Sequence, residues 1–152
     1  MSEHKVRLEQ MLPLLQERLA AGQDVQFAPR GISMQPMLRD GQDCVTLSPV
    51  RGPLKKYDLP LYRRTDGQFV LHRVVSVSGQ TYTCIGDNQF APEPGVEHSW
   101  VIAVVTAFTR KGRRWSVDST LYQFYCRFWH ISRPVRHLLC RGWGKLKRSL
   151  KK

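Results

Sequence analysis

The chain has 152 residues, which is long enough to bury a hydrophobic core, and its 41% hydrophobic and 10% aromatic content excludes a disordered protein. The net charge of +12 is unevenly placed: residues 1–109 hold 11 basic and 11 acidic side chains, whereas residues 110–152 hold 13 basic side chains and Asp118 alone as an acid. We therefore predict a charge-balanced domain followed by a basic tail.

Neither export nor a bound metal is indicated. Residues 1–5 carry mixed charges and lead into an amphipathic stretch, so we expect no secretory signal. The longest nearly apolar stretch, residues 100–108, is too short to cross a bilayer as a helix. The 4 cysteines are widely spaced and form no zinc-type cluster, which predicts free thiols in a cytoplasmic protein with no metal and no cofactor.

The first predicted element is an amphipathic helix over residues 6–19, where apolar positions recur every two to four residues. It should end near Gly22, and Pro13 should kink it or open its second half. A short strand at residues 24–28 then leads to an irregular segment at residues 31–38.

The rest of the body is predicted to consist of strands. They are expected at residues 44–47, 59–64, 69–78, 81–85, 100–108 and 115–117. An Asp-Gly turn within residues 65–68 predicts a hairpin, and the prolines and glycine of residues 90–95 predict a loop. The fold is therefore expected to be mostly β, a small coiled sheet or open barrel with one helix in front.

Beyond residue 120 the apolar spacing becomes helical, with an interruption at Pro134. We predict a domain at residues 1–118 and a basic amphipathic helical tail at residues 119–152. A solvated helix packed on the domain explains such a tail as well as an anionic partner does. Among polyanions, a membrane surface is favoured over nucleic acid, because Phe124 and Phe128 supply apolar area that phosphate binding does not need.

A candidate nucleophile lies in the irregular segment. Ser33 stands two positions after Gly31, and Pro36 disfavours regular helix there. Alone, such a serine is an ordinary turn residue. However, His72 lies in a predicted strand, and a neutral imidazole can take the proton of a serine hydroxyl at pH 7. A carboxylate at residues 87–93 can accept the other ring N–H, so the chain carries nucleophile, base and acid in that order.

An acyl-transfer site also needs hydrogen-bond donors for the oxyanion. The backbone N–H of Ser33, in the turn that contains Gly31, is the expected first donor. The sequence does not identify a second donor.

Three short segments carry a resemblance to a known family. They are Gly-Ile-Ser-Met-Gln-Pro-Met-Leu at residues 31–38, Leu-His-Arg-Val-Val at residues 71–75 and Gly-Asp-Asn-Gln at residues 86–89. In order and spacing they resemble the signature boxes of the signal peptidase I and LexA-type serine peptidase superfamily, over roughly residues 25–108. The resemblance implies a mostly β catalytic fold of that type.

The same resemblance implies roles for individual residues. Ser33 matches the acyl-forming nucleophile. His72 falls where bacterial signal peptidases and LexA-type repressors carry a lysine base, and where the endoplasmic-reticulum and archaeal signal peptidases carry histidine. Asp87 matches the aspartate of the Gly-Asp-Asn box, and Glu93 falls near a second acidic position of the histidine-type enzymes, so either acid can orient His72.

The chain also departs from the family pattern. It has no expected spanning segment, so a signal-peptide substrate does not follow from the resemblance. Gly31 stands where many bacterial members have a serine that supplies a second oxyanion donor. LexA-type members cut themselves at an Ala-Gly bond, and residues 21 and 22 form such a bond, although Gly22 as a helix cap explains it more simply.

We therefore expect a serine endopeptidase that acts on a peptide or protein substrate. Ser33 and His72 would form the dyad, with Asp87 or Glu93 as the helper. The expected location is the cytoplasm, with residues 119–152 as the means of any attachment to the inner face of the membrane. The alternative is a peptidase-like module without turnover that binds membrane or DNA through this tail.

Overall fold

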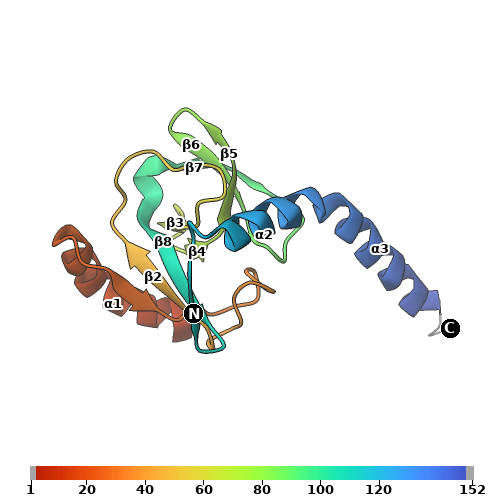
Figure 1. Cartoon of the computed structure of the whole chain (residues 1–152), viewed down its shortest axis with the longest axis horizontal. Coiled ribbons are helices and arrows are strands. Elements are labelled where there is room, and N and C mark those ends of the chain that lie inside the picture. Colours follow the sequence, from red (N-terminus) through yellow and green to blue (C-terminus); the bar gives the residue numbers. More distant parts are fainter. Residues whose placement is uncertain (1–2, 150–152) are drawn as a thin grey trace.

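The computed structural model describes residues 3–149, with side chains described for residues 8–141. These residues form three α-helices and two antiparallel sheets, one of six strands and one of three (Figure 1). Helices take up a share of the chain comparable with that of the strands, so the fold is mixed helical and β, whereas a mostly β fold was predicted.

In chain order the elements are α1 (Glu3–Ala20), β1 (Val25–Phe27), β2 (Cys44–Ser48), β3 (Pro60–Arg63), β4 (Phe69–Leu71), β5 (Arg73–Ser78), β6 (Thr81–Ile85), β7 (Glu93–Glu97), the 3-10 helix η1 (His98–Trp100), β8 (Val101–Arg110), β9 (Arg113–Ser116), α2 (Thr120–Ile131) and α3 (Arg133–Ser149). The strands β1, β2, β3, β6, β8 and β9 confirm predicted strands, with small shifts at their ends.

The six-stranded sheet has the order β1-β2-β8-β3-β4, and β9 also pairs with β8. The predicted hairpin is confirmed, because β3 and β4 pair antiparallel with Tyr62 opposite Val70. The strands that the structure describes do not close into a barrel, and β1 and β4 each have one neighbour. These two strands therefore present free edges.

The helix α1 packs on this sheet through one side. Leu8, Leu15 and Leu19 are buried in the main core cluster, and burial of a leucine side chain contributes roughly 1.5–3 kcal/mol. The helix continues through Pro13 without a break. As predicted, it stops before Gly22, which has a φ of 74° and a left-handed capping conformation.

The predicted single strand at residues 69–78 is wrong. It is divided into β4 and β5, which belong to different sheets, with His72 between them. Leu71 pairs with β3, whereas Arg73 pairs with Ile85 of β6. All three residues from 71 to 73 are buried, because the chain passes from one sheet to the other at this point.

The predicted loop at residues 90–95 is also partly wrong, because Glu93–Glu97 forms β7. This strand pairs with β6 alone and so lies at the edge of the three-stranded sheet. An edge strand tolerates Pro94, since one side of its backbone needs no partner. As a result, Glu93 is held in a sheet.

The predicted tail divides into two different parts. Tyr122 and Cys126 of α2 are buried in the main core cluster, so the predicted boundary between residues 118 and 119 separates residues that share one core. Pro134 interrupts the helix as predicted, as the second residue of α3. From there α3 extends away from the body (Figure 1).

Some expectations lie outside the described residues. They concern the apolar and basic side chains predicted for the tail at residues 143–151, and the side chain of Val6. Among the described helices, none is long and apolar enough to cross a membrane.

Candidate active site

Ser33 lies in the irregular connection between β1 and β2, where a second loop packs against its backbone. The Asn88 N–H donates a hydrogen bond to the Ser33 carbonyl oxygen at 2.8 Å. A Cβ atom at Gly86 would lie 2.6 Å from that oxygen, so only glycine permits this approach. The loop at residues 86–89 therefore positions the backbone of the candidate nucleophile.

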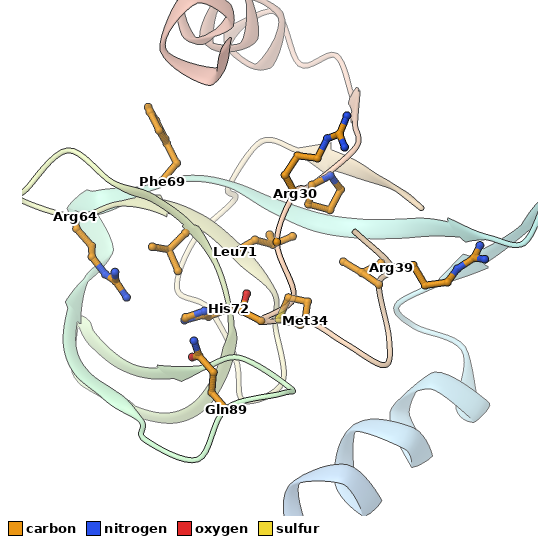
Figure 2. A pocket seen from close by; sticks show the side chains of 13 residues that line it. Arg30, Met34, Arg39, Arg64, Phe69, Leu71, His72 and Gln89 are labelled. Atoms are coloured by element: carbon orange, nitrogen blue, oxygen red, sulfur yellow. The ribbon is translucent and has the colours of Figure 1, made fainter. Parts of the chain in front are cut away.

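Ser33 and His72 line the same cleft, which has a volume of about 230 Å³ (Figure 2). One wall comes from residues 29–31, directly after β1, and another from residues 69–71 of β4. The cleft thus lies beside β4 and beside the segment that follows β1, two strands that each have a free edge. Among the described residues, the Ser33 hydroxyl and the His72 ring do not form a hydrogen bond. In catalytic sites without substrate this bond is often long and shortens only when substrate binds.

A relay of polar contacts reaches Nδ1 of the His72 ring. The Tyr62 hydroxyl donates to Glu93 Oε2 at 2.7 Å and lies 3.5 Å from His72 Nδ1. Glu93 Oε2 is 3.9 Å from the same nitrogen. Because the single Tyr62 proton is directed to Glu93, the Tyr62 oxygen can accept a hydrogen bond from Nδ1–H. This arrangement favours the tautomer with an unprotonated Nε2, the form that a general base requires.

Glu93 is itself held by Arg64. The Arg64 guanidinium donates to Glu93 Oε1 and Oε2, both at 2.6 Å. These hydrogen bonds lower the pKa of Glu93, although its partial burial works in the opposite direction, so it is a carboxylate at neutral pH. Bidentate pairing also fixes the orientation of the carboxylate.

Burial sets the protonation states of the other two residues of the relay, His72 and Tyr62. It lowers the pKa of His72 to about 4, with Glu93 opposing the shift, so the ring is neutral at pH 7. Burial, together with the hydrogen bond to Glu93, raises the pKa of Tyr62 well above its usual value. Tyr62 therefore remains a hydrogen-bond donor.

The structure separates the two acids that were predicted as helpers of His72. Glu93 lies beside the ring, whereas Asp87 is fully buried and bonded to Arg73 through both carboxylate oxygens, each at 2.8 Å. Burial alone would lower the pKa of Arg73, but Asp87 more than offsets this and holds the guanidinium charged. Glu93 is therefore the acid that contacts the candidate base.

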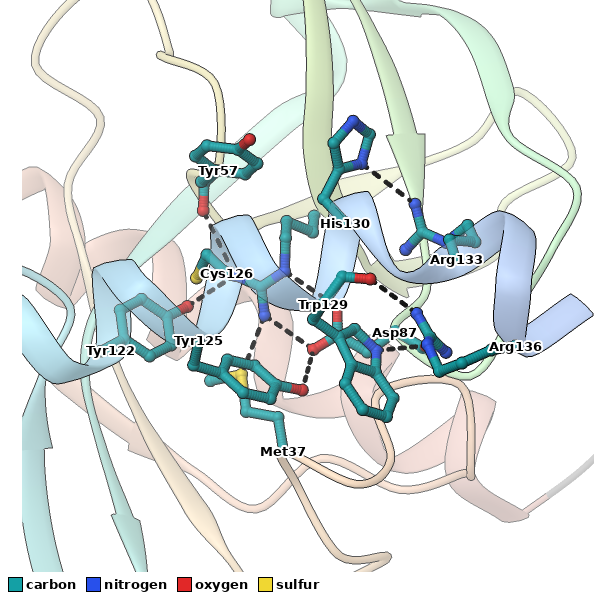
Figure 3. Close-up of polar contacts among 11 residues, drawn as sticks. Met37, Tyr57, Asp87, Tyr122, Tyr125, Cys126, Trp129, His130, Arg133 and Arg136 are labelled. Carbon is teal, nitrogen blue, oxygen red and sulfur yellow. Dashed lines mark hydrogen bonds and ion pairs between the residues drawn. The ribbon is translucent and has the colours of Figure 1, made fainter.

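Asp87 also connects α2 to the candidate site (Figure 3). Its carboxylate accepts a hydrogen bond from Tyr125 at 2.9 Å, and its backbone oxygen accepts one from Trp129 Nε1 at 2.8 Å. Asp87 is followed by Asn88, which holds Ser33. A short series of contacts thus runs from α2 to Ser33.

The backbone N–H groups of Gly31 and Ser33, both in the turn predicted to hold the oxyanion, differ in their hydrogen bonds. The Gly31 N–H donates to Asp40 Oδ1 at 2.9 Å, so it is already used. The Ser33 N–H has no hydrogen-bond partner among the described residues, and it belongs to a residue that lines the cleft. Gln89 also lines the cleft, and its Oε1 accepts from the Gly86 N–H at 3.3 Å, which leaves the amide N–H₂ as a donor.

Sequence reasoning missed Tyr62, Arg64 and Gln89. A signal for Tyr62 was present in the predicted hairpin: a residue opposite Val70 is a diagonal neighbour of His72 on the same face. No comparable signal indicated Arg64, since its partner Glu93 lies on a strand that was predicted as a loop.

No known family model matches this chain, and no curated protein matches its sequence. Among the side chains that the structure describes, no three His, Cys, Asp or Glu residues form a group that could hold a metal ion.

Proposed function

We propose that this chain is a serine endopeptidase of the signal peptidase I and LexA type, in its histidine variant. Ser33 is the nucleophile and His72 the general base. The proposal is carried by one observation: the two side chains line the same cleft, while Tyr62 and Glu93 lie beside Nδ1 of the imidazole.

In the proposed reaction, Nε2 of neutral His72 takes the Ser33 proton as Oγ bonds to the carbonyl carbon of the substrate. The imidazolium then gives that proton to the leaving amine as the peptide bond breaks. Water, deprotonated by His72, hydrolyses the acyl-enzyme. Because burial disfavours the imidazolium, the Glu93 carboxylate is needed close by to stabilise it.

Two donors are available for the oxyanion. The Ser33 N–H has no other partner among the described residues, and the Gln89 amide is anchored through its oxygen. In this proposal the Gln89 side chain takes the place of the serine that many bacterial members of the family carry at the position of Gly31.

The substrate is proposed to be an extended peptide segment. The walls of the cleft adjoin β1 and β4, whose free edges can pair with an added strand. The lining combines apolar side chains, among them Met34, Leu38 and Leu71, with Ser33, His72, Gln89 and the arginines at positions 30, 39 and 64. Such a lining suits a peptide that carries both apolar and acidic side chains near the cleaved bond.

The test is covalent labelling with a fluorophosphonate probe, followed by mass spectrometry of the labelled peptide. We expect label on Ser33, and none on Ser33→Ala. Ser99→Ala, which changes an exposed serine, is the matched control and should label like the wild type. Equal labelling of wild type and Ser33→Ala would remove the proposal. A folded wild type that takes up no label would favour the alternative of a module without turnover.

A further inference from the structure

An apolar stripe runs along α2 and the first half of α3. Its side chains recur at three- and four-residue steps, and each is 58–73% exposed to solvent. The apolar stripe consists of Leu121, Phe124, Phe128, Ile131, Val135, Leu138 and Leu139. The rings of Phe124 and Phe128 stack with their centroids 6.3 Å apart, which forms an aromatic surface on the outside of α2.

The apolar stripe is not the face that attaches α2 to the body. Tyr122 and Cys126 are buried in the core, and Tyr125 and Trp129 hydrogen bond to Asp87. A helix that serves only to cover the domain needs one apolar face, whereas α2 has two. The second face therefore requires another explanation.

Positive charge accompanies the apolar stripe. Residues 119–152 contain no Asp or Glu and nine Lys and Arg residues. Arg127 and Arg141 are exposed, whereas Arg133 and Arg136 are half-buried and hydrogen bond to His130 and Trp129. None of the ion pairs formed by described side chains includes these four arginines. Arg127 and Arg141 therefore present positive charge that no described acidic side chain neutralises.

We propose that the apolar stripe, together with the exposed Arg127 and Arg141, forms a docking surface for an anionic phospholipid bilayer. The aromatic and aliphatic side chains enter the boundary between headgroups and acyl chains, while the guanidinium groups contact lipid phosphates. Its three- and four-residue spacing also suits a coiled coil with a second copy, but two such tails would bring only positive charges together. Nucleic acid would neutralise the arginines and leave the stripe in water.

The docking surface lies on the helix that holds the loop at residues 86–89. Through Asp87 and Asn88, α2 is connected to the Ser33 backbone. A docked protein would therefore hold its cleft in a defined relation to the membrane surface. The docking itself does not depend on the proposed chemistry of Ser33.

The experiment is co-sedimentation of the full chain with vesicles of phosphatidylcholine alone, or of phosphatidylcholine with phosphatidylglycerol. We expect binding only to the vesicles that contain phosphatidylglycerol, with weaker binding at high salt. Phe124→Ser/Phe128→Ser should weaken that binding at least about tenfold, because two large apolar groups no longer leave water. Met11→Ser/Leu14→Ser, which changes exposed apolar residues of α1, is the matched control and should bind like the wild type.

Three results would overturn the proposal. The first is absence of wild-type binding, or equal binding by the Phe124/Phe128 variant. The second is sedimentation equilibrium that shows a dimer in the wild type and a monomer in that variant, which would assign the stripe to a second copy. The third is tight binding of duplex DNA by both proteins without vesicle binding. Ser33 labelling is unaffected by each of these results, so failure of the docking surface and failure of the proposed function remain distinguishable.

Discussion

Two tyrosine–histidine pairs in this chain show how a third residue changes what such a pair can do. Tyr82 lies 2.8 Å from His98 Nδ1, and its oxygen accepts the Leu54 N–H. That pair links β6 to η1, and the Tyr82 oxygen also holds the loop that contains Leu54. Tyr62 instead donates a hydrogen bond to a carboxylate, Glu93, and its oxygen can accept a hydrogen bond from His72. Only the second arrangement can stabilise an imidazolium.

This difference predicts the effect of removing each hydroxyl. Tyr62→Phe breaks the relay between His72 and Glu93, so we expect the rate of Ser33 acylation by the fluorophosphonate to fall by about 10²-fold. Tyr82→Phe removes a buried hydroxyl outside the cleft and serves as the control, with an acylation rate close to that of the wild type. Equal losses in the two variants would show that the Tyr62 hydroxyl acts only through stability.

The buried state of His72 predicts a dependence of stability on pH. The unfolded histidine has a pKa of about 6.5. Because the folded pKa is lowered to about 4, the unfolded state binds the proton more readily between these values. The stability that the neutral His72 ring contributes is thus fully present above about pH 6.5 and is lost as the pH falls towards 4. Between pH 7 and pH 5 this group should cost about 2 kcal/mol of unfolding free energy.

Urea unfolding at the two pH values measures that loss. The loss of unfolding free energy between pH 7 and pH 5 should be about 2 kcal/mol smaller in His72→Gln, because this variant has no imidazole at that position to take up a proton. His137→Gln, a change at an exposed histidine, should keep the full decline. A wild type and a His72→Gln variant with the same decline would contradict the buried, neutral histidine.

At the level of single residues, the sequence indicated Ser33 and His72 as a candidate nucleophile and base but left two acids open. Asp87 and Glu93 are both within a short segment, and no local pattern distinguishes them. The choice depends on side-chain direction across two sheets: Asp87 faces Arg73 and α2, and Glu93 faces Tyr62 and His72.

Among the elements, α2 is the one whose role differs most from its sequence pattern. It was predicted as part of a separate tail, yet Tyr125 and Trp129 of α2 hydrogen bond to Asp87 (Figure 3), which pairs with the buried Arg73. Arg73 also donates to Tyr122 at 2.8 Å and to Cys126. Burial of an arginine is tolerated only when such partners compensate for lost water.

The Arg73–Asp87 pair predicts a large loss of stability in Asp87→Asn. That change leaves the Arg73 charge without its counterion, so we expect the free energy of unfolding in urea to fall by roughly 3–5 kcal/mol. Asp43→Asn is the control, and it should cost less because its partner Arg39 reaches solvent. Unchanged stability together with slow Ser33 acylation in Asp87→Asn would instead assign Asp87 to the orientation of His72.

The strand that carries His72 shows why element boundaries were misjudged. Alternation of side chains continues from Phe69 to Ser78 in sequence, so the pattern predicts one strand. The chain bends at His72 to leave β3 and join β6. A bend of this kind is decided by packing between two sheets and leaves no mark in local periodicity.

At the scale of the whole molecule, the chain consists of a body that ends with α2 and a projecting helix, α3. This division predicts that two truncations behave differently. Deletion of residues 133–152 should leave the urea unfolding free energy close to that of the full chain. Deletion of residues 119–152 also removes Tyr122 and Cys126 from the core and exposes Arg73, so it should cost several kcal/mol. Equal stability of the two truncated proteins would contradict the assignment of α2 to the body.

The sequence by itself determined the helix and strand segments with strong periodicity, the hairpin turn, the uneven charge and the pairing of Ser33 with His72 as candidates. These features depend on local spacing, turn chemistry and composition, which are readable along one chain. Only the tertiary structure decided that Glu93 rather than Asp87 contacts His72, that Tyr62 and Arg64 complete the relay, and that α2 belongs to the core. Each of these depends on which side chains meet across separate strands and helices. The pattern of residues along the chain does not contain the distances between such side chains.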